Sequence, residues 1–163
     1  MRCVVRRSPY TVYQHFIKYE EQAAEIYLQM AARFTPENRE IGSLWLEIGM
    51  QEKQHAGLLQ FCVAEGLFAP VLPSDAEIHK LDKTFTKLMQ RAKDPKLSIQ
   101  DSFDIATELE TSEVNGIYSY LTTPLHNSMY LLRRKVMTSL PDHVDRIARE
   151  AKKYAGSLQA CRN

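Results

Sequence analysis

Residues 41–62 read IGSLWLEIGMQEKQHAGLLQFC, and their apolar residues recur at steps of three or four. This spacing traces one face of an α-helix that packs against a core. Glu52 and His55 fall on that apolar face, and because they are three residues apart their side chains project together. A buried, unpaired carboxylate is costly, so it takes up a proton, pairs with a polar group or binds a metal ion. The stretch therefore predicts a core-facing helix that carries a carboxylate and an imidazole.

The preceding residues predict another helix, antiparallel to the first. Ser8-Pro9 is typical of a helix start, and Thr35-Pro36 is predicted to end this helix and to cap the next one. Glu20 occupies an apolar position on its core face. Glu20 and Glu52 are about equally far from the turn, and each residue adds about 1.5 Å, so the two carboxylates are expected at the same height.

Start and stop signals divide the rest of the chain into further helices. The expected ranges are 74–93, 98–121, 126–139 and 141–161. Ser98 and Asp101 have the spacing of a capping box, and Pro124 interrupts the helix that they open. Four long helices therefore form two hairpins, joined by a crossover that contains the short helix over 74–93. This is the layout of a one-crossover four-helix bundle, and we predict a single domain over residues 1–163.

A third carboxylate, Glu110, lies on the core face predicted for the helix over 98–121. Counting from the second hairpin's turn places Glu110 level with Ala151 on the last helix. Glu113, with Tyr120, offers a competing register, so whether Glu110 or Glu113 faces the core stays open.

The segment EEQAAEIYLQMA at 20–31 resembles the first helix of the ferritin-like superfamily, in which a ligand Glu precedes a tyrosine by seven residues. The segment EKQHA at 52–56 resembles the Glu-x-x-His-Ala motif of the second helix, and the 32-residue gap between the two glutamates is closest to the rubrerythrin branch. The resemblance implies an all-α, ferritin-like four-helix bundle with a carboxylate-bridged di-iron centre. The ligands that it implies are Glu20, Glu52, His55 and Glu110, with Tyr27 beside them.

The predicted last helix departs from the family pattern. Residues 147–155 align with the family's last-helix motif, with Ala151 in place of the Glu and Tyr154 in place of the His. Two of six expected ligands are therefore missing. Glu150 is adjacent to Ala151 but rotated by about 100° around the helix. Tyr154 is expected to pack in the core with its hydroxyl on a carboxylate.

Two further observations from the sequence bear on the site. Tyr118 follows Glu110 by eight residues, whereas the family spacing is seven. The remaining histidines receive no ligand role, because none has a partner three or four residues away; they are His15, His79, His126 and His143.

The resemblance implies ferrous-iron oxidation, or the reduction of peroxide or dioxygen, as the activity of an oxidoreductase. The oxygen and imidazole donors suit manganese and zinc as well as iron, and the missing ligands leave one ion as an alternative to two. The chain has no Cys-x-x-Cys pair, so electrons are expected from a separate protein. The rival interpretation is a metal-free helical module that acts through self-association or a partner. Hydroxylation of an organic substrate is a third alternative.

Composition limits the other classes of function. The chain has 21 basic and 20 acidic residues and a formal net charge of +1, which argues against a nucleic-acid-binding protein. No stretch reaches the roughly 20 apolar residues of a membrane span, and the first seven residues lack the apolar core of a secretory signal. Three cysteines without paired spacing fit a reducing compartment, so we expect a cytoplasmic protein. Ferritin-like proteins commonly form dimers or larger shells, so a homo-oligomer is also expected.

Overall fold

The structure is a computed structural model that describes residues 7–121 and 143–157. Within these ranges it is helical and has no strand, which confirms the all-α class. The helices are α1 (Pro9–Phe34), α2 (Arg39–Ala64), α3 (Asp75–Ala92), α4 (Ile99–Glu113), the π-helix η1 (Val114–Tyr118), α5 (Ser119–Leu121) and a last helix over 143–157. The short helix predicted over 126–139 lies outside the described residues. None of the helices in the described ranges is long and apolar enough to cross a membrane.

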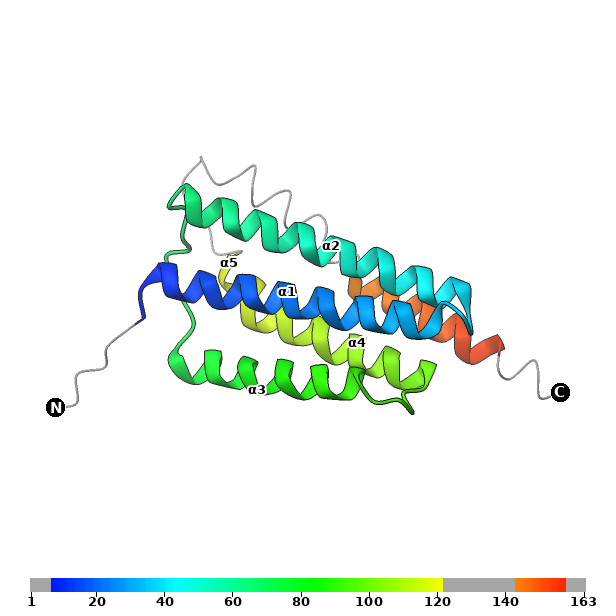
Figure 1. The fold of residues 1–163 in the computed structure, drawn as a ribbon. Coiled ribbons are helices and arrows are strands. Elements are labelled where there is room, and N and C mark those ends of the chain that lie inside the picture. The colour runs from blue at the N-terminus through cyan, green and yellow to red at the C-terminus, as the bar shows by residue number, and fades with distance from the viewer. Residues whose placement is uncertain (1–6, 122–142, 158–163) are drawn as a thin grey trace.

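Helices α1 and α2 form the predicted antiparallel hairpin and pack along their length (Figure 1). The side chain of Ser8 accepts a hydrogen bond from the Thr11 backbone N–H and caps α1 as expected. The start of α2 differs from the prediction, because Asn38 rather than Thr35 is its N-cap. Thr35 stays in the helical conformation and both its N–H and its hydroxyl donate to the Ala31 carbonyl. The turn therefore needs extra residues before α2 can begin.

A close approach of backbone at this turn requires a glycine. A Cβ atom at Gly42 would lie 2.3 Å from the Thr35 hydroxyl oxygen and 2.6 Å from the Thr35 Cα. Because backbone cannot move aside as a flexible side chain can, any larger residue at Gly42 would push α1 and α2 apart at this end.

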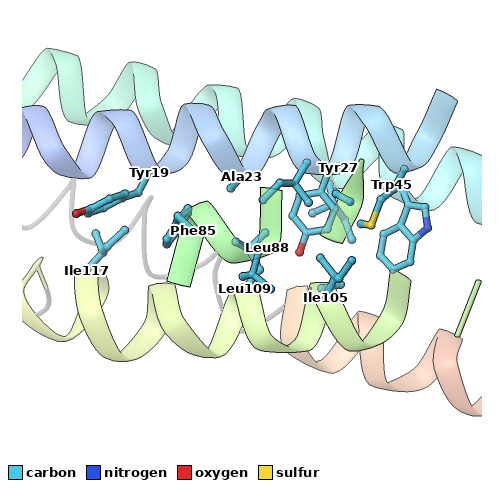
Figure 2. Close-up of a cluster of buried hydrophobic side chains, with 14 of the residues drawn as sticks. Tyr19, Ala23, Tyr27, Trp45, Phe85, Leu88, Ile105, Leu109 and Ile117 are labelled. Carbon is cyan, nitrogen blue, oxygen red and sulfur yellow. The ribbon is translucent and has the colours of Figure 1, made fainter. Parts of the chain in front are cut away.

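Helix α1 is central, since it packs against α2, α3 and α4 (Figure 1). Capping boxes begin both α3 and α4, at Ser74 with Glu77 and at Ser98 with Asp101, as the sequence predicts for α4. Figure 2 shows aromatic and aliphatic side chains from α1, α2, α3, α4 and η1 filling the space between these helices. Large rings dominate this core, and Tyr27 of α1 stacks on Trp45 of α2 with ring centroids 5.8 Å apart.

Candidate metal centre

The three ligands predicted on the first hairpin lie together in the core. Glu20 comes from α1, and Glu52 and His55 come from α2; their exposed fractions are 0%, 0% and 4%. The His55 Nδ1 is 2.8 Å from Glu52 Oε2 and 3.6 Å from Glu20 Oε2. One ligand atom from each of the three residues lies within 4.8 Å of the other two, close enough to hold one metal ion. We call these residues the first ligand group.

A second ligand group consists of Glu52, Glu110 and His143, all of them buried. The His143 Nδ1 is 3.0 Å from Glu52 Oε1 and 3.5 Å from Glu110 Oε2. Glu52 belongs to both groups and presents a different oxygen to each histidine. The two ligand groups therefore form two adjacent sites that share the Glu52 carboxylate.

His143 was predicted to have no ligand partner, but the structure places its ring beside Glu52 and Glu110. This position follows from the register of the last helix on α2. Lys153 pairs with Glu40 at 3.2 Å, and Arg146 pairs with Glu47. The two pairs are seven residues apart on both helices, so the helices run antiparallel with a fixed register. His143 lies almost one turn beyond Arg146 and therefore reaches the level of Glu52. Charges of opposite sign spaced by seven were a signal for this register, but nothing local to His143 indicated it.

This register also corrects the expectation for Ala151 and Tyr154. Tyr154 is eleven residues from His143, or about 16 Å along the helix, and its ring lies 6.1 Å from the ring of Phe103 rather than against a carboxylate. Glu150 is oriented toward Lys153, at 3.6 Å. The count from the second turn fails because it places Ala151 at the level of Glu110, whereas His143, eight residues earlier, lies there.

Two buried tyrosines each donate to a carboxylate of the centre. The Tyr27 hydroxyl donates to Glu110 Oε1 at 2.6 Å, and the Tyr118 hydroxyl donates to Glu20 Oε1 at 2.9 Å. One bond joins α1 to α4 and the other joins η1 to α1. The π-helix η1 explains how Tyr118 can lie eight residues after Glu110, since a π-turn takes up an additional residue before the helix face repeats. Both bonds occupy one carboxylate oxygen and leave the other for a histidine or a metal ion.

Glu113 adds a fourth carboxylate to the centre. The sequence left open whether Glu110 or Glu113 faces the core, and the structure shows that both do. Glu110 and Glu113 are both buried, each with 1% of its surface exposed. Neither oxygen of Glu113 has a hydrogen-bond partner among the described residues. Burial raises the pKa of Glu113 well above its ordinary value, and the charges of Glu52, Glu20 and Glu110 add to the effect. The sequence indicated this arrangement, because Glu110 and Glu113 are three residues apart and so lie on the same face of a helix.

Several buried atoms of the centre lack a hydrogen-bond partner in the described part of the chain. They are Glu20 Oε2, Glu52 Oε1, Glu110 Oε2, both carboxylate oxygens of Glu113, and His143 Nδ1. Buried polar atoms are normally hydrogen-bonded, so a group of orphaned atoms needs an explanation. Carboxylate oxygens only accept, as does the Nδ1 of a neutral imidazole protonated on Nε2. Such a cluster requires added positive charge, supplied by metal ions or by protons.

Protons are strongly held when no metal is bound. Burial raises the pKa of Glu20 to about 8. Burial alone would lower the histidine values, but the neighbouring carboxylates outweigh it and raise the pKa of His55 to about 10 and that of His143 to about 9. Burial would also raise the pKa of Glu52, yet His143 and His55 outweigh it and lower that pKa to about 2. The metal-free centre at neutral pH is thus an ionised Glu52 between two imidazolium groups.

Comparison of the chain with protein-family models, with curated proteins and with solved structures finds no match. The buried glutamate and histidine groups could hold metal ions, and they are the part of the molecule from which a function can be inferred.

Proposed function

We propose that the protein is a ferritin-like, rubrerythrin-like metalloprotein that holds two divalent metal ions, one at each ligand group, with Glu52 shared between them. The observation that carries the proposal is a set of buried acceptor atoms, without hydrogen-bond partners among residues 7–121 and 143–157, that four helical segments direct to one place. Unpaired buried acceptors cost free energy that a core evolved only for packing would avoid. A bound cation would satisfy them.

Charge balance favours two ions over one. The carboxylates of Glu20, Glu52, Glu110 and Glu113 carry four negative charges when ionised, and all are buried. With both histidines neutral, two divalent ions neutralise this charge. A single ion would leave two negative charges uncompensated. No lysine or arginine is buried among the described residues, so two of the carboxylates would have to stay protonated.

Iron is the metal that we propose, on the strength of the resemblance of both motifs, although manganese and zinc also accept this donor set. Iron held there would supply the change of oxidation state needed to reduce dioxygen or peroxide. The chain's own groups would orient the ligands and handle protons: Tyr27 and Tyr118 hold hydroxyl protons on Glu110 and Glu20. Large buried rings such as Trp45 exclude water. A separate protein would donate the electrons.

The rival is a metal-free helical module, and one observation favours it. Glu52 accepts from His55 at 2.8 Å and lies 3.0 Å from His143, so two imidazolium groups can neutralise it without a metal ion. In that state Glu20, with a pKa of about 8, holds a proton, and burial favours the protonated forms of Glu110 and Glu113. The rival predicts no dependence of fold or stability on added metal.

Metal content after anaerobic reconstitution with ferrous iron separates the two functions. We expect two equivalents of iron per chain by elemental analysis, and a large loss in Glu20→Gln. The matched control is Glu21→Gln, because Glu21 is the adjacent residue on α1 but is exposed. No bound iron, with an unchanged unfolding temperature when metal is added, would reject the metalloprotein and support the module. Equal iron loss in both variants would reject the assignment of Glu20.

A further inference from the structure

Gln51 contacts the second ligand group from outside. It precedes Glu52 on α2 and is half-buried, and its Oε1 lies 2.8 Å from His143 Nε2. The side-chain amide oxygen can only accept, so the ring proton of His143 in this contact is on Nε2. The opposite ring nitrogen, Nδ1, faces Glu52 and Glu110, and its lone pair becomes available when a metal ion displaces the Nδ1 proton.

Histidines that ligate metals usually donate their other ring N–H to an oxygen acceptor, which fixes both the tautomer and the orientation of the ring. We propose that Gln51 is a positioning residue for the second metal ion: it keeps the Nε2 proton of His143 in place and so presents Nδ1 as the ligating atom. This inference rests on the proposed metal centre and adds to it a residue that touches no metal.

The surroundings of His143 show why the ring depends on this contact. His143 is the single member of the two ligand groups on the last helix, whereas the other members lie on α1, α2 and α4. Apart from the contacts of His143 itself, the nearest polar link between that helix and α2 is Arg146 with Glu47, whose side chains are 31% and 59% exposed. Exposed ion pairs hold a helix only weakly and do not fix the rotation of a neighbouring ring. The Gln51 amide acts on the ring itself.

Two substitutions separate the acceptor role from packing. Gln51→Glu keeps an acceptor of similar size, and Gln51→Met keeps the length and volume but removes the acceptor. Gln54→Met is the matched control, because Gln54 is an exposed residue of the same helix.

The probe is zinc alone, titrated against a competing chelator. We expect the wild type to bind two equivalents, and Gln51→Met to bind the second one 10–100-fold more weakly, the usual effect of losing such a partner. Gln51→Glu and Gln54→Met should stay within about threefold of the wild type for that ion, a change well below the loss of a ligand partner. Imidazole ¹⁵N spectra of the zinc-loaded wild type should show Nδ1 bound to metal and Nε2 protonated for His143.

Each outcome has one meaning. Two ions bound by Gln51→Met with wild-type affinity and unchanged ¹⁵N shifts would overturn the role of Gln51 and leave the metal centre standing. No zinc bound by the wild type would overturn the metal centre, and this role with it. Equal weakening of both ions in Gln51→Met, together with a lower unfolding temperature of the metal-free protein, would show a general structural role and also overturn the inference.

Discussion

Metal binding should release protons, and the structure sets how many. His55 and His143 have pKa values of about 10 and about 9, and Glu20 has a pKa of about 8, so all three hold protons at pH 7. Burial also raises the pKa of Glu113 and, to a smaller extent, that of Glu110. A metal ion binds only the deprotonated forms. Loading both sites at pH 7 should therefore release about three to five protons per chain.

Calorimetric titration of the metal-free protein with zinc, in buffers of different ionisation enthalpy, measures this number directly. Each proton released strengthens the apparent binding by about tenfold per unit rise in pH, so affinity should increase steeply between pH 6 and pH 7. Glu113→Gln should release fewer protons than the wild type, because burial favours the protonated form of Glu113 in the metal-free state. Release of less than one proton per bound ion, with affinity independent of pH, would show that the zinc is bound elsewhere and not by these buried groups.

Three further outcomes follow from the same geometry. The metal-free protein should lose stability as the pH rises: the raised pKa values of His55, His143 and Glu20 give stability that is complete below the unfolded-state values and is lost through about 8 to 10. An unfolding temperature that increases from pH 5 to pH 10 would contradict this. Tyr27→Phe should cost about 1–3 kcal/mol in denaturant unfolding, because it leaves an oxygen of buried Glu110 unpaired; no cost would mean that the bond is absent. Zinc should slow amide hydrogen exchange in residues 143–157, since His143 ties this helix to the centre, and unchanged exchange in the zinc-bound protein would exclude His143 as a ligand.

The positions of the ligands on the first hairpin could be predicted because they depend only on residues close together in the sequence. Glu20, Glu52 and His55 lie on uninterrupted helices, and only one short turn separates the helices. The helical period therefore determined both the face and the height of each side chain. An error at the start of α2, from Pro36 to Arg39, changed the height by less than one turn and did not separate the ligands.

The relation between Glu110 on α4 and His143 on the last helix could not be predicted in the same way, because it depends on register across a long interval of sequence. His143 lies 33 residues after Glu110, and no residue near it has ligand spacing. The height of His143 along the bundle depends on contacts between helices, such as the pair of Arg146 with Glu47. The periodicity of one helix carries no information about such contacts. The π-helix η1 also altered the face on which Tyr118 lies, and this local change in period brought it to Glu20. A strict 3.6-residue repeat cannot indicate such an insertion.

The central claim is that two metal ions share Glu52. The most direct measurement is an anomalous difference map, recorded at the iron absorption edge, from crystals of protein loaded anaerobically with ferrous iron. We expect two peaks about 3.5–4 Å apart, as in other two-metal sites, one beside His55 and the other beside His143, with Glu52 between them. A map without peaks at this place, or with iron bound only on the surface, would contradict it.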